Sequence, residues 1–191
     1  KMRANQEIMD LIQALGCGYG DNYDSSKLRY ERVVIMTDAD VDGAHIASLL
    51  MTFFFREMPQ MVADGNLYLA MPPLYRISQG GTVAYARDDA HKDELLETVF
   101  TGRGKIDISR FKGLGEMPPA QLKETTMNPD SRTLLKVVLP EGEELPQKTK
   151  RSVKHKAGST ADLVERLMGR KPEQRLKFIQ QNAEKVDYVD V

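Results

Sequence analysis

Three aspartates at alternate positions, Asp38, Asp40 and Asp42, stand directly after an apolar run of the sequence. The run covers residues 32–37, contains adjacent β-branched residues, and predicts a buried strand. In open α/β sheets, binding sites form at the carboxyl ends of the strands. Carboxylates two positions apart in an extended turn can point to one side, where a divalent cation relieves their repulsion. Because Mg²⁺ prefers one or two carboxylates together with phosphate oxygens, the spacing predicts a Mg²⁺ site that meets a phosphate.

Three other interpretations of this acidic turn compete with the metal site. The simplest is a solvated turn in which an aspartate caps the following helix. The spacing also fits the start of a calcium-binding EF-hand loop, but position twelve must be a glutamate and is Leu49 here. A haloacid-dehalogenase-like phosphatase likewise carries an Asp-x-Asp pair after a buried strand. That class needs a small hydroxyl residue shortly after the pair, where this chain has Val41-Asp42. Because the match is incomplete, the phosphatase is kept only as the alternative enzyme class.

A second group of candidate residues is basic. Between positions 103 and 112 the positive charges are opposed only by Asp107, and they are Arg103, Lys105, Arg110 and Lys112. Gly113 and Gly115 follow, and glycines let a backbone approach a phosphate closely. A solvated basic face is the usual explanation of such a run. Next to a metal site that meets a phosphate, contacts from this segment to phosphate groups are the competing explanation.

The elements that must position these residues alternate between strand and helix patterns. Strands are predicted over residues 32–37, 66–70, 74–78, 82–86, 106–111 and 133–139. Helices are predicted over residues 5–15, 44–57, 88–99, 118–125, 160–168 and 172–183. Gly80-Gly81 joins the third and fourth strands as a hairpin. This order predicts an α/β fold, with a mostly parallel, Rossmann-like sheet flanked by helices on both faces.

The composition changes after Leu139. Residues 140–158 show no apolar periodicity and hold an acidic cluster followed by five basic residues. We therefore expect a domain over residues 1–139, a charged linker or mobile loop over 140–158, and a helical tail over 159–191. The chain begins with Lys1 and not with Met, which indicates that the domain is incomplete at its N-terminus.

The overall composition excludes several classes of protein. Of 191 residues, 41% are hydrophobic, which is too many for a wholly disordered chain. Lys and Arg number 27 against 28 Asp and Glu, so the chain is not a globally basic nucleic-acid binder. The single cysteine, Cys17, excludes an internal disulfide and suits a reducing cytosol. The most apolar stretch, residues 44–55, is too short for a membrane span, and residues 1–10 lack a signal-peptide core, so a cytoplasmic protein is expected.

Four ordered blocks of the sequence resemble one family. The acidic turn, Asp38 to Ile46, resembles the acidic motif of the TOPRIM domain of type IIA DNA topoisomerases. Residues 72–76 (Pro-Pro-Leu-Tyr-Arg) and 111–117 (Phe-Lys-Gly-Leu-Gly-Glu-Met) resemble two further motifs of that family, and residues 128–132 match its Asn-Pro-x-x-Arg turn. Within the family, the C-terminal part of bacterial topoisomerase IV B subunits is the nearer likeness, and gyrase B subunits are the near alternative.

The resemblance implies a metal site that works on DNA. It assigns Mg²⁺ to Asp38 and Asp40, with Asp42 as a third ligand or as support, and with Mn²⁺ or Ca²⁺ as substitutes. It adds a glutamate from a block that is not found in this sequence and is expected upstream of Lys1. It favours phosphate contacts for basic residues in and near the motifs, namely His45, Arg76, Arg110, Lys112 and Arg132.

The resemblance also implies a division of labour between two kinds of protein chain. The nucleophilic tyrosine belongs to the topoisomerase A subunit, and ATP is bound by an N-terminal region that this sequence does not contain. Two A and two B subunits together cleave both strands of DNA, pass a second duplex and reseal the break, as a nucleoid-associated isomerase. We therefore expect no catalytic residue in this chain alone and no activity of the isolated polypeptide.

Overall fold

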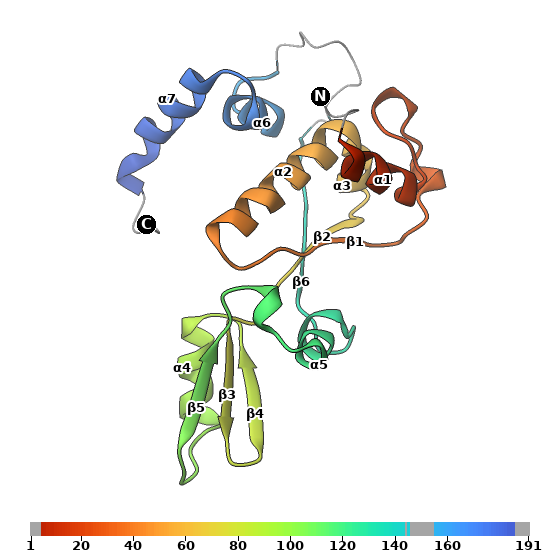
Figure 1. Ribbon diagram of the computed structural model, residues 1–191. Helices are drawn as coiled ribbons and strands as arrows, with labels where there is room; N and C mark the ends of the chain where they lie inside the picture. Colours follow the sequence, from red (N-terminus) through yellow and green to blue (C-terminus); the bar gives the residue numbers. More distant parts are fainter. Residues whose placement is uncertain (1–4, 144, 146–154, 186–191) are drawn as a thin grey trace. The chain divides into compact units, whose positions relative to one another are not determined.

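The computed structural model describes residues 5–143, 145 and 155–185 (Figure 1). The chain divides into two compact units that interleave along the sequence. The first unit gathers described residues of the ranges 1–33, 48–67 and 136–191, and the second gathers residues 34–47 and 68–135. This division into units does not coincide with the expected domain boundary after Leu139, and that boundary stays a prediction. Most of the expected linker over 140–158 lies outside the described residues.

The first unit begins with helix α1, Gln6–Leu15, whose two ends follow from local side-chain and backbone chemistry. The Asn5 side chain accepts a hydrogen bond from the Ile8 amide, which satisfies one of the unpaired donors at the helix start. At the other end, Gly16 takes a φ of 73°, a left-handed conformation that glycine adopts without steric cost. The sequence predicted both this helix and its stop.

The core of the first unit forms where α1 and later segments bury their apolar side chains. Two short 3-10 turns follow α1, and they are η2 (Gly20–Asn22) and η3 (Ser25–Lys27). Helix α3, Pro59–Ala63, follows directly on helix α2, which covers Val41–Glu57. The most deeply buried side chains of this unit are Cys17, Phe54, Met58, Met61 and Leu67. Cys17 therefore fills core space, as a buried free cysteine does.

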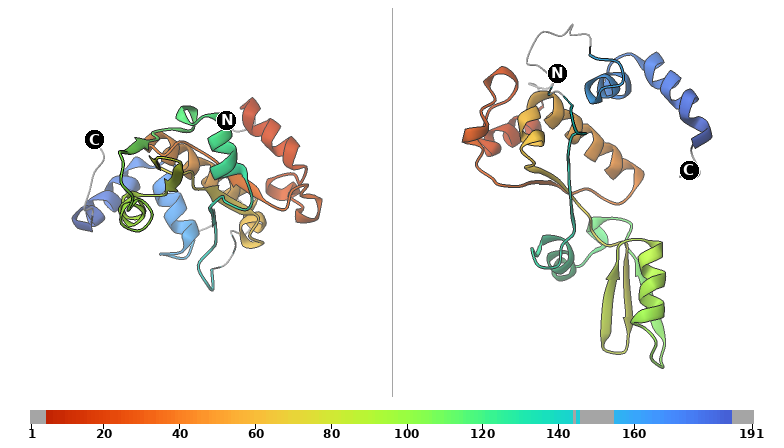
Figure 2. Two further views of the ribbon diagram at one scale, coloured as in Figure 1. Left: turned by 90° about the horizontal axis from the view of Figure 1, so that it is seen from below. Right: turned by 180° about the vertical axis from the view of Figure 1, so that it is seen from behind.

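Two helices that pack against each other end the described chain, α6 (Thr160–Met168) and α7 (Pro172–Asn182), with a last 3-10 turn, η6 (Ala183–Lys185) (Figure 2). The Ser159 hydroxyl caps α6 by accepting from the Asp162 amide. Within the first unit, Arg56 donates to the Glu165 carboxylate at 2.9 Å and so links α6 to α2. The sequence predicted both helices of the tail.

Three short strands form one sheet in the order β1-β2-β6, and they cover Val33–Ile35, Leu67–Ala70 and Leu134–Lys136. Ile35 and Leu67 are buried, whereas Val34 and Leu135 are exposed. Each strand lies inside its predicted range. The acidic turn begins three residues after β1 ends, and α2 begins three residues earlier than predicted.

A second sheet lies in the second unit and is antiparallel throughout. Its order is β4-β3-β5, and the strands cover Thr82–Ala86, Tyr75–Gln79 and Ile106–Arg110. In the middle strand, Tyr75 stands opposite Ala86 on one side and Arg110 on the other. The predicted hairpin is therefore confirmed, and the expectation of mostly parallel strands does not extend to this sheet.

Helix α4, Asp89–Thr98, lies alongside this antiparallel sheet (Figures 1 and 2). The buried core here consists of Tyr75, Ile77, Ala86 and Phe100, with Leu95 and Leu96 of α4 packed against it. The alternation of the middle strand puts Tyr75 and Ile77 on this covered face. Arg76 must then point to the opposite face.

The segment after β5 contains the remaining elements of the second unit. They are a 3-10 turn η4 (Leu114–Glu116), helix α5 (Pro119–Leu122) and a π-helical turn η5 (Lys123–Met127). The sequence predicted one helix over residues 118–125 here. The Thr125 hydroxyl donates to the Gln121 carbonyl, and both Thr125 and Thr126 are buried.

Among the helices that the structure describes, none has both the length and the apolar character that a membrane-spanning helix needs.

Candidate metal and DNA site

Asp40 precedes the first residue of α2 and caps that helix. Its carboxylate Oδ1 accepts a hydrogen bond from the Gly43 amide at 2.7 Å, and its carbonyl accepts from the Ala44 amide at 3.0 Å. This is the pattern of an N-cap aspartate, which satisfies a donor at the helix start and benefits from the helix dipole. The capping interpretation is therefore correct for Asp40. It leaves the Asp40 side chain exposed, with its second oxygen free of hydrogen bonds to other described residues.

Asp38 is held by a segment 76 positions away in the sequence. The Leu114 amide donates a hydrogen bond to Asp38 Oδ1 at 2.7 Å. Gly113 packs closely on the same carboxylate, since a Cβ at Gly113 would lie 3.1 Å from both the carboxyl carbon and Oδ1. Like Asp40, Asp38 is exposed, and its second oxygen accepts no hydrogen bond from the described residues.

The segment that holds Asp38 is a compact loop over residues 111–117. The Lys112 amide donates to Glu116 Oε2 at 2.8 Å, and the Glu116 amide donates to the Gly113 carbonyl at 3.2 Å. Phe111 and Met117 are buried at the two ends of the loop. A small apolar pocket lies beside it, lined by Ala39, Pro72, Pro73, Phe111, Gly113, Leu114 and Met117. Three of the four sequence motifs therefore meet around this pocket.

Asp42 lies beyond the turn that carries Asp38 and Asp40, and its part in the metal site stays a prediction. It lies in the first turn of α2, where an acidic side chain complements the helix dipole. No group of three or more acidic, histidine or cysteine side chains in the described ranges is arranged to hold a metal ion. Because α2 begins at Val41, Asp42 is helical, and the expected alternation in an extended turn applies only to Asp38 and Asp40. His45 lies one turn further along α2 and is exposed.

Asp38 and Asp40 fit the donor chemistry of a Mg²⁺ site. Each is an exposed carboxylate with one oxygen fixed by a backbone amide and the other open. Mg²⁺ is bound in many phosphate-handling sites by one or two carboxylates, with waters and phosphate oxygens completing the octahedron. These two residues would therefore supply part of a Mg²⁺ site, with Asp42 as a further predicted ligand or support.

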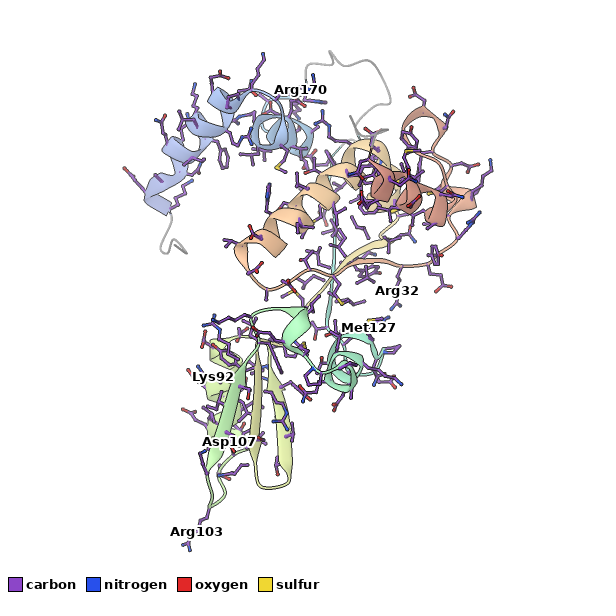
Figure 3. All side chains as sticks on the ribbon, viewed as in Figure 1. Arg32, Lys92, Arg103, Asp107, Met127 and Arg170 are labelled. Atoms are coloured by element: carbon purple, nitrogen blue, oxygen red, sulfur yellow. The ribbon has the colours of Figure 1, made fainter. Side chains whose placement is uncertain are left out.

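The basic segment is divided between the two ends of strand β5. Figure 3 shows Arg103 at the tip of the loop that precedes β5, and Lys105, which follows it, is paired with Asp107 at 3.0 Å. Arg110 is the last residue of β5, and Lys112 follows in the loop that holds Asp38. A strand rises by about 3.3 Å per residue, so the five steps from Lys105 to Arg110 separate these two residues by roughly 16 Å. Only the exposed Arg110 and Lys112 therefore lie at the end where the motifs meet.

Two other residues predicted to contact DNA, Arg76 and Arg132, donate hydrogen bonds to neighbouring residues of the fold. Arg76 lies in the middle strand, half-buried, with Tyr85 opposite on β4. Its Nη1 donates to the Ser78 hydroxyl at 3.3 Å, and its Nε is inaccessible and has no partner among the described residues. Arg132 is also half-buried and donates to the Met127 carbonyl at 3.3 Å. A role in DNA binding stays a prediction for both residues.

The sequence reasoning missed a polar cluster around Tyr75. The Tyr75 hydroxyl donates to Asp89 Oδ1 at 2.8 Å, and the Lys92 ammonium lies 2.7 Å from the same carboxylate oxygen and 4.9 Å from the centre of the Tyr75 ring. The hydrogen bond from Lys92, followed by that from Tyr75, lowers the pKa of Asp89. The guanidinium of Arg110 lies over the same ring at 5.9 Å. Helical spacing between Asp89 and Lys92 was the available signal, since residues three apart face each other.

Known families match both parts of the chain. The Toprim domain model matches residues 2–72, which contain the acidic turn, and the model of the DNA gyrase B subunit carboxyl terminus matches residues 103–180. The chain belongs to the B-subunit family of type IIA DNA topoisomerases. A Toprim domain is a metal-binding domain in topoisomerases, which agrees with the chemistry of Asp38 and Asp40.

Individual relatives in this family are similar over nearly the whole chain. The chain is 60% identical to the DNA topoisomerase 4 B subunit of Bartonella bacilliformis over 191 residues, which are all of this chain and 26% of that protein. It is 59% identical to the Caulobacter vibrioides protein of the same name over 96% of this chain and 24% of that protein. The DNA gyrase B subunit of Halalkalibacterium halodurans is 44% identical over all of this chain and 28% of its own length. The chain thus spans about a quarter of these relatives.

Proposed function

We propose that this chain is the metal-holding and DNA-contacting part of a topoisomerase IV B subunit. In that role it supports ATP-dependent cleavage of both DNA strands, passage of a second duplex and religation, together with the A subunit in a two-plus-two assembly. The chain is more similar in sequence to the topoisomerase 4 proteins than to the gyrase protein, which favours a topoisomerase IV B subunit over a gyrase B subunit. ATP would be bound by another part of the complete protein, and the assembly would work on the chromosome in the cytoplasm.

One observation carries the proposal. The carboxylate of Asp38, in the acidic turn, accepts a hydrogen bond from the loop that carries Lys112. This hydrogen bond ties the acidic turn directly to a basic loop. A metal ion at the acidic turn would neutralise charge at a scissile phosphate, and a cation beside it would hold the neighbouring backbone of the DNA. Such a pairing suits chemistry on a phosphodiester.

Each residue has a defined part in this proposal. Asp38 and Asp40 would hold Mg²⁺ through their open oxygens, and Asp42 would support the negative field from the first turn of α2. Arg110 and Lys112, both exposed, would contact DNA phosphates, with His45, Arg76 and Arg132 as further candidates. The chain supplies no nucleophile in this scheme, because the attacking tyrosine belongs to the A subunit. The phosphatase alternative is not proposed, since the matched relatives are topoisomerase subunits.

The test combines the A subunit with the complete B subunit, which carries Asp38→Asn or Asp40→Asn. Asparagine keeps an oxygen that accepts the Leu114 or Gly43 amide, and it is as good an N-cap residue as aspartate. Each substitution should therefore preserve folding while it removes ligand charge. We expect loss of Mg²⁺-dependent cleavage and of plasmid relaxation by at least about 100-fold, an effect comparable to removing one strong electrostatic contact in an active site.

The chain offers a matched control in Asp88. Its carboxylate accepts from the His91 amide at 2.7 Å and so caps α4 in the same way that Asp40 caps α2. Asp88→Asn makes the same chemical change at a helix start with no proposed metal role, and it should leave relaxation unchanged. Relaxation by Asp40→Asn within a few fold of the Asp88→Asn enzyme would refute the metal assignment.

A further inference from the structure

We propose that Glu116 and the Gly113-Leu114 peptide are positioning residues that fix the Asp38 carboxylate as a metal ligand. This inference rests on the proposed function and deepens it. It concerns residues that would touch neither metal nor DNA and that act through Asp38. Three features support it, and all of them lie within the second unit.

The first feature is the hydrogen bond from Leu114 to Asp38. A carboxylate on an exposed turn is otherwise free to rotate about its side-chain bonds, and ordering it on binding a metal costs entropy. The Leu114 amide, at 2.7 Å, fixes Oδ1 in one position and leaves the second oxygen as the ligand. Loss of a group that orients a metal ligand in this way typically lowers metal affinity by about 10- to 100-fold.

The second feature is the close packing of Gly113. The three side-chain atoms at the end of Asp38 lie 3.1 to 3.3 Å from where a Cβ of residue 113 would stand. Such contacts are tighter than ordinary van der Waals distance, so a side chain at position 113 would displace the Asp38 carboxylate by a few tenths of an ångström. The backbone of Gly113 is extended, with φ of −153°, and this residue is needed for the space it leaves and not for its conformation.

The third feature is the closure of the loop by Glu116. Its carboxylate accepts from the Lys112 amide at 2.8 Å, and its own amide donates to the Gly113 carbonyl at 3.2 Å. The first bond holds the Phe111-Lys112 peptide, and the second holds the carbonyl of the Gly113-Leu114 peptide itself. Phe111 and Met117 anchor the two ends of the loop in the core, and Glu116 fixes the peptides between them, which keeps the Leu114 amide aimed at Asp38.

One pair of variants isolates the Leu114 amide. Leu114 is the first residue of a 3-10 turn, a position where proline is tolerated, and the preceding residue is already extended as proline demands. Leu114→Pro therefore deletes the donor with little change of backbone, whereas Leu114→Ala removes the side chain and keeps the donor. In the complete B subunit, Mn²⁺ binding followed by electron paramagnetic resonance should weaken about 10-fold or more in Leu114→Pro and little in Leu114→Ala.

A second pair isolates the Glu116 carboxylate and covers the case in which Leu114→Pro does not fold. Glu116→Ala removes the acceptor for the Lys112 amide, whereas Glu116→Gln retains an oxygen in that place. We expect Mn²⁺ affinity to fall about 10-fold in Glu116→Ala and to be largely kept in Glu116→Gln. Hydrogen exchange of the Leu114 amide should be faster in Glu116→Ala, and Glu97→Ala, an exposed change on α4, should alter neither quantity.

The outcomes separate this inference from the proposed function. If Asp38→Asn leaves Mn²⁺ binding unchanged, the metal assignment itself fails. If Asp38→Asn abolishes binding but Leu114→Pro and Glu116→Ala bind Mn²⁺ as the wild-type protein does, the metal site stands and the positioning role is wrong. Equal losses in Glu116→Ala and Glu116→Gln would also overturn it, because charge and not loop closure would then be responsible.

Discussion

Gly43 lies against the backbone of Asp38. A Cβ built on Gly43 would stand 2.1 Å from the Asp38 carbonyl oxygen and 2.8 Å from the carbonyl carbon, both of which are backbone atoms that cannot swing away. Helix α2 therefore approaches the start of the acidic turn more closely than any residue with a side chain would allow. The glycine that ends the Asp-x-Asp-x-Asp-Gly pattern is thus explained by this close approach.

Gly43→Ala should consequently disturb both stability and the acidic turn. Adding a methyl group where no space exists forces a backbone shift, and such overpacking costs about 1–3 kcal/mol of unfolding free energy. Denaturant unfolding of the 191-residue chain measures this loss. Gly115→Ala is the matched control, because a Cβ at Gly115 meets no atom within 4 Å. Equal stability of the two variants would show that the turn adapts without strain.

Lys112→Ala should weaken DNA binding without changing any preference for sequence. A lysine that contacts one phosphate releases about one counterion, so its loss lowers the slope of log affinity against log salt by about one unit. A salt titration of duplex binding by the complete enzyme measures the slope. Lys123→Ala removes an exposed lysine of η5 outside the basic segment and serves as the control. An unchanged slope in Lys112→Ala would assign Lys112 to the solvated surface.

The pattern of the sequence predicted the described strands and every described α-helix except α3, because their signals are local, and it missed the 3-10 turns. Asn5 and Gly16 mark the two ends of α1 within a few residues of the helix itself. The start of α2 was misplaced by three residues, since Asp38, Asp40 and Asp42 are all plausible caps in sequence and only the Asp40 to Gly43 bond decides between them. The π-helical turn at Lys123–Met127 carries no comparable sequence signal.

The candidate site was predictable in its residues but not in its contacts. Spacing proposed Asp38, and the basic run together with the family resemblance proposed Lys112. Neither signal joins Asp38 to Leu114, because a contact over 76 positions depends on how the whole unit folds. For Arg76, the alternation of the strand already places it on the face opposite Tyr75 and Ile77. What the sequence could not show is that the Nε atom of Arg76 is inaccessible on that face.

The Asp89 carboxylate should make stability depend on pH in the acid range. The hydrogen bonds from Lys92 and Tyr75 hold the pKa of Asp89 below its ordinary value. A group whose pKa is lowered by folding binds protons more readily in the unfolded chain, so its contribution is present above about pH 3.9 and is lost as pH falls through the lower, folded value. Stability from this group therefore rises with pH across that window.

Asp89→Asn tests this dependence. The melting temperature of the isolated chain should fall relative to wild type near neutral pH, and the difference should shrink as the pH is lowered below about 3.9. Asp130→Asn, an exposed position in the same unit, should show no such trend. A wild-type advantage that stays constant down to acid pH would mean that the Lys92 and Tyr75 contacts do not depend on the charge of Asp89.

The isolated 191-residue chain should fold but neither cleave nor relax DNA. It carries Asp38 and Asp40, yet the described residues hold no set of three metal-ligating side chains. Mg²⁺ binding should therefore be weak, because ligand number and geometry are both incomplete. Of its seven tyrosines, none is assigned a nucleophilic role, and Tyr75 is buried with its hydroxyl bound to Asp89. Circular dichroism should show a folded chain, so that a lack of activity is not mistaken for a lack of structure.

The decisive measurement is a cleavage assay without the A subunit. The purified chain is incubated with supercoiled plasmid and Mg²⁺, denatured with detergent, and the DNA is examined for covalently attached protein. We expect no adduct and no relaxed plasmid, and we expect both to appear only when the complete A and B subunits are combined. A covalent adduct on the chain alone would place a nucleophile within these 191 residues and would contradict the division of labour between the two proteins.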